Sequence, residues 1–194
     1  MEAIFIRGRK KLLFGEIVWR TPMPTENELR EALTINVLTV SDTRTLENDT
    51  SGNYLCDVIK DDGHNIDQRI IVLDDIYQIR AILSNWIADK DVNAIVITGG
   101  TGFSGRDSTP EAVTPLLDKT IDGFGEVFRY LSYDEIGSST IQSRAVAGIA
   151  NNTAIFCIPG STGACQLAWK HLIKEQLDSS HLPCNFVNAF RSKN

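Results

Sequence analysis

The stretch Ile95–Glu111, IVITGGTGFSGRDSTPE, decides the fold of this chain. It opens with apolar residues that are typical of a strand buried in a parallel sheet. The glycines between 99 and 102 let the backbone turn sharply and come close to a ligand. Ser108–Glu111 then begins a helix, because a hydroxyl residue, a proline and an acid suit its first turn. This order predicts an α/β fold with its ligand site at the loop, since ligands of open α/β sheets bind at the carboxyl ends of strands.

The loop between this strand and this helix also indicates a function. A purely structural connection of this kind has about two to six residues, and this one is longer and carries the charged pair Arg106 and Asp107. A turn that needs glycine only for its geometry is the alternative. The loop is not a Walker A motif, because no Gly-Lys-Ser/Thr follows, and its helix does not follow directly as in G-x-G-x-x-G. The predicted ligand-binding residues of this loop are Thr98, Gly99, Gly100, Thr101 and Gly102.

Outward from this stretch, apolar runs that alternate with amphipathic segments predict the rest of the sheet. The predicted strands are 35–40, 67–73, 95–98 and 153–158, and the predicted helices are 53–61, 76–88, 112–117, 127–131, 138–150 and 164–177. The glycines of segment 122–126 predict a break between two of these helices. This alternation predicts a three-layer α/β/α fold with a central, mainly parallel sheet.

Two further loops follow strands of the predicted sheet, so we expect them at the same edge. The first contributes Ser41 and Asp42, and the second contributes Pro159, Gly160 and Ser161. A helix N-terminus after a Pro-Gly turn offers free N–H groups to an anion. In the first loop, Asp49 and Ser51 are equally typical of ligand contacts and of helix caps.

Composition limits the classes of partner. The chain has 194 residues and a formal net charge of −6, which argues against a nucleic-acid surface, because such surfaces are basic. No apolar run reaches the roughly 18 residues that a membrane span requires. The cysteines form no CxxC pair and the histidines lie far apart, so the spacing predicts no zinc site. Reduced thiols and a cytoplasmic location are the expectation.

The chain is predicted to hold one domain at 34–194, preceded by an extension at 1–33. The extension carries the basic patch Arg7–Lys11 and matches none of the motifs named here. A disordered arm or an upstream start codon is one interpretation. An arm that packs on a neighbouring subunit is the other.

Three motifs together resemble a known family. TGGTG at 98–102, RDSTPEA at 106–112 and GFGEVFR at 123–129 look like the MoaB/MogA family of molybdenum cofactor biosynthesis proteins, to which the pterin-binding domains of gephyrin and plant Cnx proteins are related. The resemblance runs from about Ile35 to Phe186. The stretch Ser138–Ile149 is closer to the bacterial MoaB branch than to MogA.

The resemblance implies a substrate and a reaction. MogA-type proteins bind molybdopterin and adenylylate it with Mg-ATP before metal insertion. It implies that Asp107 and Asp74 are catalytic and hold Mg²⁺, although Asp74 is also placed to cap the following helix. An enzyme and a protein that binds molybdopterin or a nucleotide without turnover both remain open. Valine at Gly100 is expected to weaken pterin binding far more than stability.

The resemblance also implies partners. Family members form trimers, and the MoaB branch resembles a hexamer made of two trimers; other molybdenum cofactor biosynthesis proteins are further candidate partners. The aromatic segment 123–131 is either a small core element or an interface, because aromatic residues and arginine are enriched where subunits meet. We expect Phe128 or Tyr130 to be buried between subunits.

Overall fold

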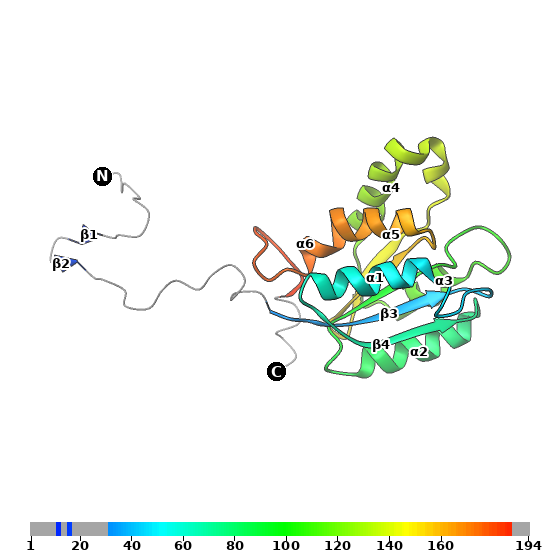
Figure 1. Cartoon of the computed structure of the whole chain (residues 1–194), viewed down its shortest axis with the longest axis horizontal. Helices are drawn as coiled ribbons and strands as arrows, with labels where there is room; N and C mark the ends of the chain where they lie inside the picture. Colours follow the sequence, from blue (N-terminus) through cyan, green and yellow to red (C-terminus); the bar gives the residue numbers. More distant parts are fainter. Residues whose placement is uncertain (1–10, 13–14, 17–30, 188–194) are drawn as a thin grey trace. The chain divides into compact units, whose positions relative to one another are not determined.

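The computed structural model describes residues 11–12, 15–16 and 31–187 (Figure 1). Its contacts divide the chain into two units, residues 1–30 and 31–194. In the first unit, β1 (Lys11–Leu12) pairs antiparallel with β2 (Gly15–Glu16). The prediction for the extension at 1–33 therefore falls largely outside the described residues. The second unit spans the range of the predicted domain, 34–194.

A six-stranded sheet in the order β4-β3-β5-β8-β7-β6 forms the middle of the second unit. The four adjacent strands β4, β3, β5 and β8 run parallel to one another. The strand β7 runs antiparallel to β8, and β6 runs antiparallel to β7. The strands are β3 (Thr34–Val40), β4 (Asn65–Val72), β5 (Ala94–Thr98), β6 (Lys119–Thr120), β7 (Val146–Ala150) and β8 (Thr153–Ile158). The mainly parallel sheet is thereby confirmed.

Helices cover both faces of this sheet. On one face α1 (Thr50–Asp61), α4 (Asp122–Ile136) and α5 (Thr162–Ala168) enclose one core, and on the other face α2 (Ile76–Ala88) and α3 (Thr109–Val113) enclose a second (Figure 1). Successive residues of β5 point to opposite cores, because side chains alternate along a strand. Val96 joins the first core and its neighbours join the second, and all are fully buried. This arrangement confirms the three-layer α/β/α fold.

Local signals set most helix ends. Asp75 accepts the N–H groups of Tyr77 and Gln78, so α2 begins at the predicted residue. Its Trp86 is buried, and the indole N–H donates to Gln68. Asp49 caps α1, so this helix starts at Thr50, before the predicted position.

The predicted helix at 112–117 appears as α3 followed by a 3-10 turn, η2 (Thr114–Leu116). The predicted helix at 164–177 is built from α5, a π-helical turn, η4 (Trp169–Ile173), and α6 (Lys174–Gln176). In the part of the chain that the structure describes, no helix combines the length and apolar character needed to cross a bilayer.

The break predicted at 122–126 is wrong. Residues Asp122–Ile136 form one helix, α4, which contains both Gly123 and Gly125. A Cβ on Gly125 would lie 2.6 Å from the Ala145 carbonyl oxygen, so this glycine lets α4 approach a neighbouring backbone. Tertiary packing here outweighs the low helix propensity of glycine. Phe128 is buried inside this unit, which excludes it as a residue held between subunits, whereas Tyr130 is exposed.

The helix predicted at 138–150 is also wrong. A 3-10 segment, η3 (Gly137–Gln142), is followed by β7, which pairs with β8. Asn151 and Asn152 join these two strands and have φ of 47° and 61°. A two-residue connection with both φ values positive is the turn that suits the twist of a hairpin, and asparagine tolerates it. Pairing with β8 therefore decides the conformation of this segment.

Candidate functional site

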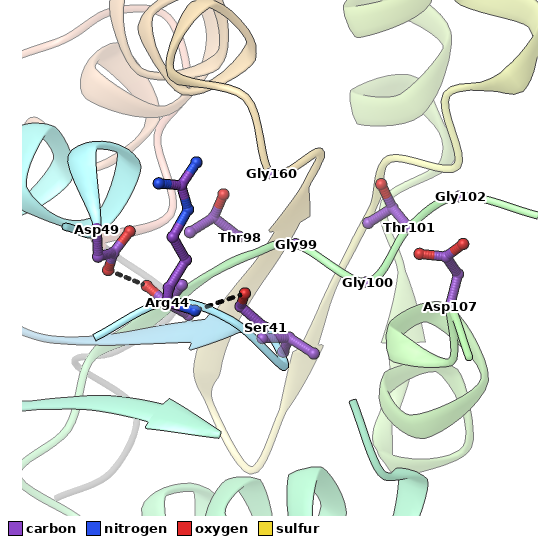
Figure 2. Close-up of a pocket in the computed structure, with 12 residues that line it drawn as sticks. Ser41, Arg44, Asp49, Thr98, Gly99, Gly100, Thr101, Gly102, Asp107 and Gly160 are labelled. Atoms are coloured by element: carbon purple, nitrogen blue, oxygen red, sulfur yellow. Dashed lines mark hydrogen bonds between the residues drawn. The ribbon is translucent and has the colours of Figure 1, made fainter. Parts of the chain in front are cut away.

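A pocket of about 290 Å³ lies where β3, β5 and β8 end (Figure 2). Figure 2 shows Arg44 and Asp49 on one side, Thr101 and Asp107 on the other, and Gly99 and Gly100 between them. The wall comes from three segments that are far apart in the sequence. It consists of Thr39, Val40, Ser41, Arg44, Asp49, Thr98, Gly99, Gly100, Thr101, Gly102, Asp107 and Gly160.

The floor of the pocket requires glycine at two consecutive positions. Gly99 and Gly100 have φ of +101° and +63°, which L side chains rarely adopt. A Cβ on Gly99 would lie 2.2 Å from the Val40 carbonyl oxygen, and a Cβ on Gly100 would lie 2.2 Å from the Thr109 hydroxyl. The turn therefore brings the ends of β3 and β5 into direct backbone contact.

The loop after β3 is held by its own side chains. The Ser41 hydroxyl accepts the N–H groups of Thr43 and Arg44, each at 3.2 Å. Asp42 reaches both neighbouring loops, because it accepts the Asp74 N–H at 3.1 Å and pairs with Arg106 at 3.0 Å. Arg44 follows in the same loop, and its Nη1 donates to the Asn48 carbonyl at 2.9 Å. It is the one arginine among the pocket-lining residues that the structure describes.

Asp49 belongs both to the pocket wall and to the scaffold. Its carboxylate accepts the Thr39 hydroxyl at 2.7 Å and the Gly52 N–H at 2.9 Å, and it pairs with Arg69 at 3.2 Å. The side chain is almost fully buried, so the paired guanidinium offsets the cost of burying its charge. The structure therefore supports the capping role for Asp49. Ser51 donates its hydroxyl to the Gly160 carbonyl and so joins α1 to the loop after β8.

Asp107 faces the pocket from the far end of the glycine loop. Its Oδ2 accepts the Ser104 N–H at 2.7 Å. Hydrogen bonds from Ser104 are the main cause that holds the pKa of Asp107 below its ordinary value, and the nearby charge of Arg144 adds to them. The carboxylate is therefore ionised at neutral pH. An ionised, partly exposed carboxylate suits a cation or a phosphate-bound metal.

Asp74 lies behind the floor rather than in the wall. Its Oδ1 accepts the backbone N–H of Ser108 at 3.0 Å and the Ser108 hydroxyl at 2.6 Å. Its Oδ2 would be 2.6 Å from a Cβ on Gly100. Asp74 therefore joins the end of β4 to the start of α3, while Asp75 caps α2.

The loop after β8 closes the pocket opposite β3. Gly160 packs on the glycine turn, since a Cβ there would lie 3.1 Å from the Gly99 Cα. The carbonyl of Pro159 accepts the Thr98 hydroxyl at 3.1 Å, and the Ser161 hydroxyl accepts the Ala164 N–H and caps α5. Pro159 and Ser161 thus support the wall without lining it.

The three predicted loops do meet, and most predicted residues line one pocket. Four predicted residues stand behind the wall: Asp42, Asp74, Pro159 and Ser161. Sequence reasoning missed three lining residues, Thr39, Val40 and Arg44, and left Asp49 open between a ligand contact and a helix cap. The position of the first loop after a core strand was the available signal for Arg44 and Asp49. Nothing local in the sequence distinguishes Thr39 or Val40 from other strand residues.

Within the described residues, no three His, Cys, Asp or Glu side chains come together in a group that could hold a metal ion. A cation at this pocket would therefore depend on one or two carboxylates and on ligand oxygens. Mg²⁺ is bound in this way in many phosphate-handling sites. Asp107 fits this donor set, whereas the Oδ1 of Asp74 already accepts two hydrogen bonds.

Comparison with known families assigns the chain to one of them. Residues 36–179 match the family described as "Probable molybdopterin binding domain". The chain belongs to this family. The matched range contains the whole pocket wall, from Thr39 to Gly160.

Individual relatives give the same result. Molybdenum cofactor biosynthesis protein B of Escherichia coli (strain K12) is 55% identical over 152 residues, which cover 78% of this chain and 89% of that protein. The protein of the same name from Staphylococcus carnosus (strain TM300) is 50% identical over 145 residues, which cover 73% and 85% of the two chains.

Solved structures also resemble the second unit. A crystal structure of molybdenum cofactor biosynthesis protein B has a TM-score of 0.73 at 43% identity and covers 76% of this chain and 92% of that chain. The tungsten cofactor synthesizing protein MoaB from Pyrococcus furiosus has a TM-score of 0.67 at 33% identity, with 76% and 93% covered. The chain is a homologue of the MoaB proteins of molybdenum cofactor biosynthesis.

Proposed function

We propose that this protein binds molybdopterin in the pocket between β3, β5 and β8 and adenylylates it with Mg-ATP. The observation that carries the proposal is the pairing of a glycine turn at Gly99–Gly100 with an ionised carboxylate, Asp107, in one wall. Glycines at such a turn leave room for a phosphate against the backbone. Family membership and the names of the relatives supply the chemical class of the ligand.

The proposed reaction is a nucleotidyl transfer. A phosphate oxygen of molybdopterin attacks the α-phosphorus of ATP, a new phosphoanhydride bond forms, and the bond to pyrophosphate breaks. The products are adenylyl-molybdopterin and pyrophosphate, so atoms and electrons balance without a redox partner. A protein accelerates such a transfer mainly by positioning the phosphates and neutralising their charge.

The two sides of the pocket suit different parts of this reaction. Arg44, on the side of β3, is placed to meet a phosphate. Asp107, on the opposite side, would hold Mg²⁺ together with phosphate oxygens, and Asp74 would fix the loop behind it. Mg²⁺, when bound, supplies charge neutralisation between the phosphate groups.

A binding protein without turnover is the second candidate function. The observation that favours it is the small number of carboxylates available to hold a catalytic metal. Among the described residues that line the pocket, the only carboxylates are Asp107 and Asp49, and Asp49 already caps α1. Such a protein would hold molybdopterin or a nucleotide for another enzyme of the pathway.

One assay distinguishes the two functions. Purified protein is incubated with molybdopterin, ATP and Mg²⁺, and adenylyl-molybdopterin and pyrophosphate are quantified together, with EDTA as the control. Equal amounts of both products, lost with EDTA, support the transferase. Tight binding of molybdopterin or of ATP with neither product would replace it by the binding protein, and failure to bind either ligand would exclude both.

A further inference from the structure

Arg144 joins a distant part of the chain to the glycine loop. It lies between η3 and β7, and its side chain is only 21% exposed. Its Nε donates to the Thr101 carbonyl at 3.0 Å, and its Nη2 donates to the Asp107 carbonyl at 2.7 Å. Its Nη1 pairs with Glu111 at the start of α3. One guanidinium therefore contacts both ends of the loop segment 101–107.

The other polar contacts of segment 101–107 are either internal to it or exposed to solvent. Ser104 and Asp107 bond to each other, through the Ser104 N–H to the carboxylate and the Asp107 N–H to the Ser104 carbonyl, so these bonds shape the turn from within. Arg106 pairs with Asp42, but the Arg106 side chain is 81% exposed. Exposed ion pairs contribute little to stability, so this pair does not fix the loop. Within residues 31–187, Arg144 supplies the largely buried link between the loop backbone and another element.

Phe103, at the tip of the same loop, lies against this guanidinium. The Arg144 Cζ is 5.1 Å from the centroid of the Phe103 ring. The ring itself is 70% exposed, so it covers the arginine without entering the core. A cation over an aromatic face is attracted to it, and this contact adds a third point at which the loop meets Arg144.

We propose that Arg144 is a positioning residue: it holds the two ends of the loop so that Thr101 and Asp107 stay in the pocket wall. The inference rests on the proposed function for the identity of the ligand, molybdopterin. Arg144 does not line the pocket, so it acts through the loop rather than by touching the ligand. Its loss would leave the fold in place and let the wall move.

Only arginine fits these acceptors. The three nitrogens of the planar guanidinium each donate a hydrogen bond to a different acceptor. Two of the acceptors are backbone carbonyls and the third is a carboxylate. A lysine has a single ammonium on a flexible stem and cannot reach the three acceptors at fixed angles. Arg144→Lys therefore keeps the charge and loses the geometry, whereas Arg144→Met loses both.

Arg80 offers a matched control. It also donates to backbone carbonyls of α3, from Nη2 to Glu111 at 2.9 Å and from Nε to Ala112 at 3.4 Å, and these hydrogen bonds do not involve segment 101–107. Arg80→Met thus removes a comparable arginine that contacts α3 and not the loop. Glu111→Gln removes the ion pair of Arg144 and keeps both carbonyl contacts.

The experiment has two readouts. Hydrogen exchange of the amides in 102–107 is measured without ligand, and molybdopterin affinity is measured per folded molecule. In Arg144→Met and Arg144→Lys we expect faster exchange and an affinity lower by about tenfold, as two lost hydrogen bonds imply. Arg80→Met should match the wild type in both readouts, and Glu111→Gln should lie close to it.

Three results would overturn the inference. The first is unchanged exchange in both Arg144 variants. The second is faster exchange with unchanged affinity, which would make Arg144 a purely structural residue. The third is equal loss of affinity in Arg80→Met. A wild-type protein that fails to bind molybdopterin would overturn the proposed function and the ligand part of this inference, and the exchange data would still decide whether Arg144 holds the loop.

Discussion

At the scale of single residues, Asp107 is the side chain on which the proposed chemistry depends. Asp107→Asn keeps the size of the side chain and one oxygen for the Ser104 N–H, but it removes the negative charge. We expect turnover to fall by about 10²-fold, a loss typical of a group that stabilises the transition state. The free energy of unfolding should change by less than about 1 kcal/mol, because the group is partly exposed.

The measurement for Asp107 pairs steady-state kinetics with urea unfolding. Asp57→Asn is the matched control, since Asp57 is an exposed acid on α1 away from the pocket. If Asp107→Asn lowers stability while the activity per folded molecule stays at the wild-type level, Asp107 is a structural residue.

Asp74 requires two substitutions to separate its charge from its hydrogen bonds. Asp74→Asn retains an oxygen that can accept both donors of Ser108, whereas Asp74→Ala leaves these donors without their acceptor. If Asp74 only fixes the start of α3, Asp74→Asn should keep wild-type activity and Asp74→Ala should lose about 1–3 kcal/mol of stability. Comparable loss of magnesium-dependent activity in both variants would instead make its charge part of the reaction.

Gly100, predicted to contact the ligand, is also required by the backbone. Its positive φ and the short distances from its Cβ position to Thr109 and Asp74 make it a requirement of the backbone. Gly100→Val should therefore destabilise the protein by about 1–3 kcal/mol as well as weaken binding. Thermal unfolding measured beside molybdopterin binding tests this, and a variant with wild-type stability would restore the expectation of a loss confined to binding.

At the scale of elements, β8 and α5 each carry a buried thiol. Burial raises the pKa of Cys157 to about 12 and that of Cys165 to about 11, from an ordinary value of 9.0. A raised pKa means that the folded protein binds the proton more tightly than the unfolded chain does. The stability contributed by each thiol is thus complete below pH 9 and is lost as the pH rises toward 11 or 12.

Unfolding measured from pH 8 to 11 should therefore show a fall in stability that Cys157→Ala and Cys165→Ala reduce. Other groups that titrate in this range are common to all variants, so the difference between curves isolates each thiol. Parallel curves for wild type and variants would contradict the raised pKa values.

At pH 8, Cys184 should react with a thiol reagent before the others, because it is exposed and the other three cysteines are buried.

The elements that could be predicted from sequence are those whose signals are local. Between Ile95 and Glu111, neighbouring residues alone predict the strand, the glycine turn and the start of the helix. The Asp75 cap likewise predicts the start of α2. The wrong predictions both depend on distant partners. Gly125 is tolerated in α4 because the backbone at Ala145 packs against it, and residues 146–150 form a strand because β8 pairs with them.

The same distinction holds for the candidate site. The loops were predictable, since each follows a core strand, and their residues meet in one pocket. The contacts of Arg144 were not, because they join residues separated by more than thirty positions, such as Thr101 at a separation of 43. The Asn151–Asn152 turn was a usable signal for β7, since Asn pairs between apolar runs favour hairpins.

At the scale of the whole molecule, apolar side chains remain on the surface of α4 and η3 after folding. Tyr130 and Ile141 are each 76% exposed. The inner side of α4 is buried, with Phe124 and Phe128 in the core. The exposed apolar residues of these two elements are Val127, Tyr130, Tyr133, Ile136 and Ile141. Exposed apolar patches of this kind often mark contact sites between proteins.

We propose that copies of this chain meet at that surface in a trimer-based particle, most simply a hexamer of two trimers. Homo-oligomers close by rotational symmetry, so the same patch would be used in every subunit. Tyr130→Glu should then lower the molar mass in solution, because it places a charge in an apolar contact. Tyr77→Glu is the control, since Tyr77 is 74% exposed but lies on α2, against the other face of the sheet.

Light scattering on the eluting protein measures this directly. A wild-type mass of several chains that drops in Tyr130→Glu and persists in Tyr77→Glu would place the contact on α4, and a mass of three chains rather than six would remove only the hexamer. A wild-type mass of one chain, 21.5 kDa, at micromolar concentration would contradict the assembly. Because Tyr130 lies two residues beyond the buried Phe128 on the same helix, circular dichroism of Tyr130→Glu must also match the wild type. With that condition met, a change in mass reports the loss of a contact between subunits and not the unfolding of α4.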